Sequence, residues 1–119
     1  MFNFLRSSTA TKGMTAAQAV AKLKSGEVTV IDVREAGEIA ASGKAMGALH
    51  IPVSLVPLKA DPKAPDCVKG LSLDKPVAVY CASGMRSGSA VQVLKRLGYD
   101  ARNIGTIRDW AAAGGAISR

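Results

Sequence analysis

The sequence has 119 residues, of which 48% are hydrophobic and 21% are charged. This length fits one domain rather than two, and the composition excludes a disordered, a collagen-like or a disulfide-scaffold chain. Sixteen Lys and Arg residues against nine Asp and Glu residues give a net charge of +7, a field that attracts small anions and acidic protein surfaces.

The cysteines and the apolar stretches limit the cofactors, partners and compartment. Cys67 and Cys81 have neither C-x-x-C spacing nor histidine-rich surroundings, so we expect no disulfide framework, no metal and no cofactor. The amino-terminal segment turns polar at Arg6, and no window approaches the ~18 apolar residues of a membrane span. Aromatic residues are few and basic residues are scattered, so we expect a cytoplasmic protein with neither a nucleic-acid nor a membrane partner.

The start of the chain predicts an arm followed by a capped helix. Residues 1–13 lack periodicity, and we interpret them as a flexible arm before a single domain over residues 14–119. Thr15 and Gln18 have the spacing of a capping box, in which each side chain binds a backbone N–H group at a helix start. An apolar face follows, up to a glycine, so the pattern predicts a helix over residues 15–25.

Two nearly continuous apolar runs predict strands that are buried on both faces of a parallel sheet. They are Val28–Val33 and Val77–Tyr80. Between them we predict a short helix over residues 35–42 and a brief strand over residues 47–51. A proline-rich segment over residues 52–76 is predicted to be mostly loop, with one turn of helix.

The last third of the chain repeats the alternation of strand and helix. Residues 82–86 are small and polar, a helix is expected over residues 87–97, and a short strand over residues 101–104. Thr106 and Asp109 have capping-box spacing for a final short helix. Buried strands that alternate with helices predict a three-layer α/β domain, in which a central parallel sheet carries helices on both faces.

Cys81 is the residue best placed for chemistry, because it stands where a buried strand meets the start of a helix. Ser83, Gly84 and Ser87 allow a tight loop whose backbone N–H groups point at the sulfur, and the helix adds the positive end of its dipole. Such donors lower the pKa of a thiol, so we expect Cys81 to be a thiolate at neutral pH. Arg86 adds a fixed cation for an anionic group.

The loop from Cys81 to Ser87, C-A-S-G-M-R-S, resembles the active-site loop of the single-domain rhodaneses, the thiosulfate sulfurtransferases. Other segments are similar to that family's DVR strand end, its GA-x-x-IP turn, its C-terminal strand and its C-terminal helix. In this sequence those segments are Ile31–Glu35, Gly47–Pro52, Leu97–Asp100 and Gly105–Gly114. The resemblance spans residues 14–115, although the family's GHIPGA segment has no counterpart here and Thr106 replaces its second glycine.

The resemblance implies the rhodanese fold and a mechanism. The Cys81 thiolate takes a sulfane sulfur from a small anionic donor such as thiosulfate, becomes a persulfide, and passes the sulfur to cyanide, a thiol or a carrier protein. Cys81 is then the catalytic residue, and the next six residues form the substrate-binding loop: Ala82, Ser83, Gly84, Met85, Arg86 and Ser87.

Two other functions stay open on this sequence. A non-catalytic sulfur carrier or regulatory binding module would keep the fold and the thiol without turnover. A phosphatase or arsenate reductase of the same fold also uses a cysteine inside a loop of N–H groups, but its arginine comes six positions after the cysteine. Here Arg86 comes five positions after Cys81, and the shorter loop favours a sulfur-sized group over a phosphate.

Further polar or bulky side chains are expected to be structural. Asp32 and Arg34 tie a strand end to neighbouring loops, Trp110 belongs to the core, and His50 is a turn residue rather than the partner of the catalytic cysteine in a Cys-His dyad. Cys67 is expected to be a half-exposed loop thiol, with a second sulfur relay as the alternative.

Overall fold

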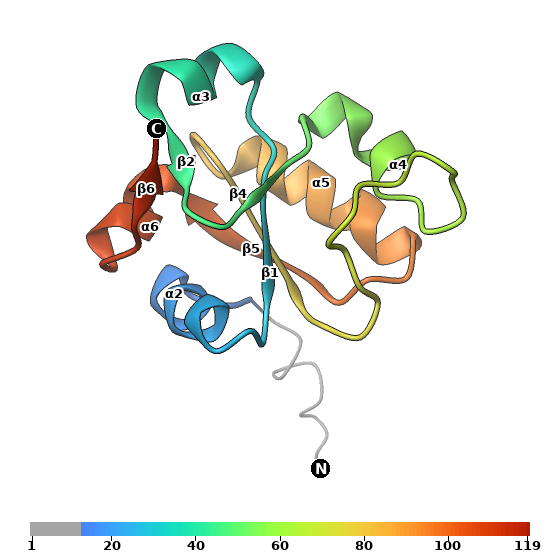
Figure 1. Ribbon diagram of the computed structural model, residues 1–119, viewed down its shortest axis with the longest axis horizontal. Helices are drawn as coiled ribbons and strands as arrows, with labels where there is room; N and C mark the ends of the chain where they lie inside the picture. Colours follow the sequence, from blue (N-terminus) through green and yellow to red (C-terminus); the bar gives the residue numbers. More distant parts are fainter. Residues whose placement is uncertain (1–12) are drawn as a thin grey trace.

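The computed structural model describes residues 13–119, so the predicted arm lies outside the described residues except for its last position. A sheet of four parallel strands forms the centre, in the order β3-β1-β4-β5 (Figure 1). The strands are β1 (Thr29–Asp32), β3 (Leu49–His50), β4 (Val77–Cys81) and β5 (Ala101–Thr106).

The two central strands, β1 and β4, are buried on both faces, as their nearly continuous apolar runs predict. Every residue of β4 is buried. Val77, Val79 and Cys81 contact one apolar cluster, while Ala78 and Tyr80 contact a second cluster on the opposite face of the sheet. The alternation of side chains along a strand therefore divides the core into two halves.

Helices cover both halves of the core (Figure 1). On one face lie α4 (Val56–Lys59) and α5 (Met85–Arg96), and on the other lie α2 (Ala16–Lys24) and α6 (Ile107–Ala112). A further helix, α3 (Ala36–Ser42), follows β1 and stands at the carboxyl end of the sheet. The predicted three-layer α/β architecture is confirmed.

Local signals set the helix boundaries. Thr15 and Thr106 each accept a hydrogen bond from a backbone N–H three residues on, in the two predicted capping boxes. Helix α5 begins at Met85, two residues earlier than predicted, because Gly84 adopts a φ of +91° and turns the chain directly into the helix. The proline-rich segment contains more helix than predicted, since a 3-10 turn over Val53–Leu55 precedes α4.

A second, smaller sheet is absent from the sequence-based predictions. It pairs β2 (Lys44–Ala45) with β6 (Ile117–Ser118) in the antiparallel direction. Strands of two residues are too short to show the alternation by which strands are recognised. The pairing holds the carboxyl-terminal segment beside the chain that leaves α3.

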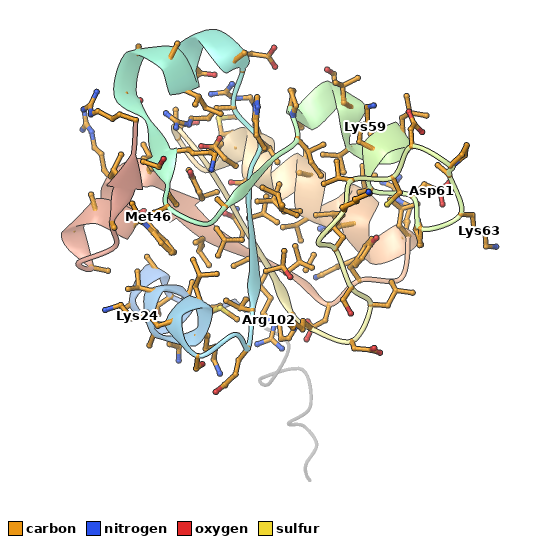
Figure 2. All side chains as sticks on the ribbon, in the orientation of Figure 1. Lys24, Met46, Lys59, Asp61, Lys63 and Arg102 are labelled. Carbon is orange, nitrogen blue, oxygen red and sulfur yellow. The ribbon has the colours of Figure 1, made fainter. Side chains whose placement is uncertain are left out.

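Basic side chains are dispersed over the described surface. In Figure 2, Lys59 and Lys63 lie near each other at the right, whereas Lys24 and Arg102 lie in the lower part of the view. Within residues 13–119 no helix has the length and apolar character needed to cross a membrane.

Candidate active site

Cys81 ends β4, and its side chain is fully buried. Polar groups of the loop surround its sulfur. The backbone nitrogen of Gly84 lies 2.9 Å from Sγ, and the backbone nitrogen and the hydroxyl oxygen of Ser87 each lie 3.3 Å away. The left-handed conformation of Gly84 makes this possible, because it folds the loop back toward the sulfur. The sulfur thus sits inside a ring of donors.

This ring decides the protonation state of the thiol. Burial raises the pKa of Cys81, because desolvation disfavours the charged form. The hydrogen bonds from the Ser87 hydroxyl and from the backbone N–H groups of Ser87, Ser83 and Gly84 favour the thiolate and outweigh burial. The pKa of Cys81 is therefore below that of an ordinary thiol, and the thiolate is the nucleophilic form.

The first turn of α5 also presents N–H groups that the described part of the protein does not use. Among residues 13–119, the backbone N–H groups of Met85 and Arg86 donate no hydrogen bond to a protein acceptor. The dipole of this twelve-residue helix adds partial positive charge at the same end. A small anion beside the sulfur would be stabilised by both effects.

Arg86 is held by an acidic partner from another element. Its guanidinium donates two hydrogen bonds to the Glu38 carboxylate of α3, at 2.6 Å and 2.8 Å. This two-pronged pair raises the pKa of Arg86 and lowers the pKa of Glu38 to about 2. The contact joins residues 48 positions apart, so the sequence pattern does not reveal it. Glu38 therefore holds the Arg86 side chain in position and compensates part of its positive charge.

Asn103 of β5 supports the ring from behind, and the sequence analysis does not identify it. Its Oδ1 accepts hydrogen bonds from the Ser87 hydroxyl at 2.9 Å and from the Gly105 backbone N–H at 2.9 Å. Its Nδ2 donates to the Gly84 carbonyl at 3.1 Å. The only sequence signal is a polar residue within the predicted strand that became β5, where the pairing of β5 with β4 shifts register. Asn103 therefore positions both the hydroxyl and the glycine that contact Cys81.

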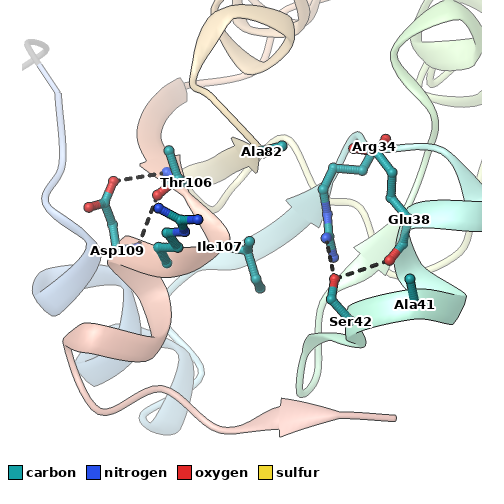
Figure 3. A pocket seen from close by; sticks show the side chains of 9 residues that line it. Arg34, Glu38, Ala41, Ser42, Ala82, Thr106, Ile107 and Asp109 are labelled. Atoms are coloured by element: carbon teal, nitrogen blue, oxygen red, sulfur yellow. Dashed lines mark hydrogen bonds between the residues drawn. The ribbon is translucent and has the colours of Figure 1, made fainter.

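The remaining loop residues face outward or toward a cavity. The side chains of Ser83 and Met85 are exposed, Met85 by 79%. Ala82 lines a cavity of about 810 Å³ between α3 and the start of α6 (Figure 3). The cavity is lined by Arg34, Glu38, Ala41, Ser42, Ala82, Thr106, Ile107, Arg108 and Asp109.

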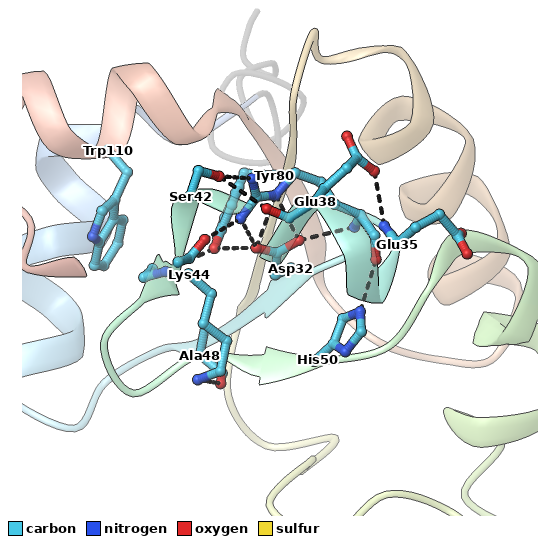
Figure 4. A network of polar contacts seen from close by, with 12 residues as sticks. Asp32, Glu35, Glu38, Ser42, Lys44, Ala48, His50, Tyr80 and Trp110 are labelled. Atoms are coloured by element: carbon cyan, nitrogen blue, oxygen red, sulfur yellow. Dashed lines mark hydrogen bonds and ion pairs between the residues drawn. The ribbon is translucent and has the colours of Figure 1, made fainter. Parts of the chain in front are cut away.

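A buried polar network supports the carboxyl end of the sheet (Figure 4). Asp32 accepts hydrogen bonds from the Tyr80 hydroxyl at 2.5 Å and from Arg34 Nη2 at 2.8 Å, and the Ala45 N–H donates to the Tyr80 oxygen at 2.8 Å. Burial and Asp32 raise the pKa of Tyr80. Arg34 also donates to the Gly43 carbonyl. Asp32 and Arg34 thus tie the end of β1 to the segment after α3, which is the structural role predicted for them.

The other residues singled out from the sequence lie outside the ring. His50 donates to the Arg34 carbonyl at 2.7 Å and belongs to β3, which β1 separates from β4, so a dyad with Cys81 does not form. Cys67 is half-buried, with its sulfur 3.7 Å from the Val68 carbonyl. Trp110 is buried in the core, and its indole N–H donates a hydrogen bond to the Ala116 carbonyl, just before β6. Residues 13–119 contain no cluster of three or more potential metal ligands.

Comparison with known proteins agrees with this geometry. The rhodanese-like domain family matches residues 15–113. A thiosulfate:glutathione sulfurtransferase of Saccharomyces cerevisiae is 33% identical over 101 residues, which cover 74% of this chain and 68% of the relative. A sulfurtransferase of Allochromatium vinosum is 33% identical over 73 residues, which cover 61% of this chain and 60% of the relative.

Two solved structures share the fold. A human single-domain sulfurtransferase has a TM-score of 0.72 and 32% identity, and the match covers 84% of this chain and 95% of the other. A Rhodopseudomonas palustris protein, described as of unknown function and a possible tyrosine phosphatase, has a TM-score of 0.77 and 30% identity, with coverages of 93% and 87%. The named relatives support sulfurtransferase activity in general. By its family match, its fold and its cysteine loop, this chain belongs to the rhodanese-like family.

Proposed function

We propose that this protein is a thiosulfate sulfurtransferase that works through a persulfide on Cys81. The observation that carries the proposal is the ring of donors around a buried sulfur, which lowers the pKa of Cys81. This ring activates the sulfur without a general base, and His50 is bound elsewhere. The thiosulfate named for the yeast relative supports the choice of donor.

In the first half-reaction, the Cys81 thiolate attacks the outer sulfur of thiosulfate. The sulfur–sulfur bond of thiosulfate breaks, sulfite leaves with the electron pair, and Cys81 becomes a persulfide. We assign stabilisation of the negative charge of the donor and of the persulfide to the N–H groups of Met85 and Arg86, which donate no hydrogen bond within residues 13–119. We therefore assign donor binding to the loop of residues 82–87, with Arg86 adding a cation that Glu38 holds in position.

In the second half-reaction, a nucleophilic acceptor attacks the outer sulfur of the persulfide. The bond between the two sulfurs breaks, and Cys81 leaves as the thiolate that begins the next cycle. Cyanide becomes thiocyanate, and a thiol becomes a persulfide. The glutathione named for the yeast relative supports a low-molecular-mass thiol as acceptor.

Mass spectrometry after exposure to thiosulfate tests this proposal directly. We expect one added sulfur atom on the wild-type protein, lost on addition of cyanide with release of thiocyanate. Cys81→Ser should gain no sulfur, while Cys67→Ser, which removes the other thiol, should behave as wild type. Sulfur on a residue other than Cys81, or its absence from the wild type, would refute the mechanism.

The same samples separate the alternatives that the sequence leaves open. A sulfur carrier without turnover would take up the sulfur and release no thiocyanate in repeated cycles. A phosphatase would hydrolyse an aryl phosphate ester, which we do not expect, because the loop places Arg86 one position closer to Cys81 than the phosphatase motif does.

A further inference from the structure

The cavity beside the loop is larger than an inorganic donor requires. Its volume is about 810 Å³, within the range of roughly 300–1,000 Å³ that holds organic ligands. Ala82, the residue directly after Cys81, forms part of its wall, and the other walls come from the region of α3 and from α6 (Figure 3). The N–H groups assigned to the donor belong to α5, which contributes no lining residue.

Most of the charged side chains that line this cavity already have a partner within the protein. Arg34 is bound to Asp32 in a buried ion pair, and Glu38 is bound to Arg86. Asp109 accepts a hydrogen bond from the Thr106 backbone N–H in the capping box of α6.

Arg108 differs from these three lining residues. Its side chain is exposed, and within residues 13–119 it takes part in no ion pair and no side-chain hydrogen bond. It is thus the cation of the cavity that remains available to a ligand.

We propose that this cavity binds the sulfur acceptor, that the acceptor is a thiol carrying a carboxylate, and that Arg108 determines this specificity. A guanidinium presents paired N–H donors that match the two oxygens of a carboxylate, so Arg108 holds the far end of the acceptor. The acceptor's thiol, deprotonated by solvent, then attacks the outer sulfur of the Cys81 persulfide. This inference rests on the proposed function, because it requires the persulfide.

A matched pair of thiols tests the role of Arg108. Glutathione and its diethyl ester share the thiol and nearly the same size, but only glutathione carries free carboxylates. We expect the ratio of kcat/KM for glutathione to kcat/KM for the diester to fall about tenfold in Arg108→Ala, the loss expected for one charge-assisted hydrogen bond. Arg108→Lys should recover part of the ratio.

The control removes the same charge at a distant site. Arg96 lies in the last turn of α5, at the helix end away from Cys81, and Arg96→Ala should leave the ratio unchanged. An unchanged ratio in Arg108→Ala, or an equal fall in both variants, would overturn the assignment of Arg108. Wild-type persulfide formation from thiosulfate, measured by mass in the same experiment, separates this failure from a failure of the proposed function.

Discussion

Ser87 supplies two donors to the Cys81 sulfur, one from its backbone and one from its hydroxyl. The hydroxyl has one hydrogen but two possible acceptors within reach, the Cys81 sulfur and Asn103 Oδ1. When Cys81 is a thiolate, the hydrogen is best used toward the sulfur, while Asn103 Oδ1 keeps the Gly105 N–H. The side chain of Ser87 thus adjusts the acidity of the nucleophile without moving the backbone.

We predict that Ser87→Ala raises the pKa of Cys81. The thiolate is present above that pKa, so reactivity should be lost at a higher pH as the solution is acidified. At pH values below the pKa of Cys81, alkylation by iodoacetamide should be about tenfold slower than in the wild type, which is the effect expected for the loss of one hydrogen bond to a charged group. The measurement is the rate of alkylation against pH in a Cys67→Ser background.

Ser89→Ala is the matched control, since it makes the same change on an exposed position of the same helix. Its alkylation profile should superimpose on that of the wild type. If the Ser87→Ala profile did so as well, the hydroxyl would have no part in stabilising the thiolate.

At the scale of elements, the two-stranded sheet of β2 and β6 fixes the segment that follows α3. Gly43 ends α3 with a φ of +78°, and a Cβ atom there would lie 2.6 Å from the Ser118 carbonyl oxygen and 2.7 Å from Ile117 Cγ2. The Gly43 carbonyl also accepts a hydrogen bond from Arg34, which lines the cavity. This glycine therefore connects the carboxyl-terminal strand to the site.

Gly43→Ala should lower the free energy of unfolding by about 1–3 kcal/mol, because it combines a strained backbone conformation with a steric clash. Gly37→Ala is the counterpart: Gly37 lies within α3 with no atom near its added Cβ, and the change should stabilise by about 0.5–1 kcal/mol. Urea unfolding of both variants measures the difference. Equal midpoints would show that β6 does not constrain Gly43.

The elements that the sequence predicts are those with strong local signals. Strands β1 and β4 lie in nearly continuous apolar runs, and the capping boxes at Thr15 and Thr106 fix two helix starts within a few residues. Cys81, the proposed nucleophile, stands out in the same way, because its loop joins a buried strand to a helix.

The rest depends on contacts between distant segments, which local patterns do not encode. Glu38 meets Arg86 only after α3 is placed at the end of the sheet. Asn103 reaches Ser87 only after β5 has paired with β4, beside a shift in the register of that pairing. Strands β2 and β6 exist because they pair with each other, and neither is long enough to carry a pattern.

At the scale of the whole molecule, the net charge of +7 would act on thiosulfate, the donor proposed above, because thiosulfate is a small anion. The field raises the local concentration of anions, and salt screens it. We predict that the second-order rate of persulfide formation from thiosulfate falls several-fold between about 10 mM and 100 mM salt, as the Debye length shortens from ~30 Å to ~10 Å.

Iodoacetamide, which is uncharged, provides the comparison for this measurement. Its rate of reaction with Cys81 should change little over the same range of salt. If the rate of persulfide formation from thiosulfate also changed little with salt, the charge of the protein would have no part in the association with thiosulfate.

The sulfur of Cys81 occupies a place in α5 that a capping side chain takes in other helices. Gly84 offers no side chain at the helix start, and the N–H groups of Gly84 and Ser87 end on the sulfur instead. The atom that we propose to react is therefore also the helix cap. Cys81→Ser keeps an acceptor in this place and Cys81→Ala removes it, so Cys81→Ala should unfold more easily by about 0.5–2 kcal/mol.

Urea midpoints of the two variants, with Cys67→Ala against Cys67→Ser as the reference pair, measure this contribution. Equal stability of Cys81→Ala and Cys81→Ser would mean that the helix does not depend on the cap. If the helix does depend on the cap, formation of the proposed persulfide would change the cap at the start of α5. The melting temperature of the protein would then differ between the free thiolate and the persulfide form.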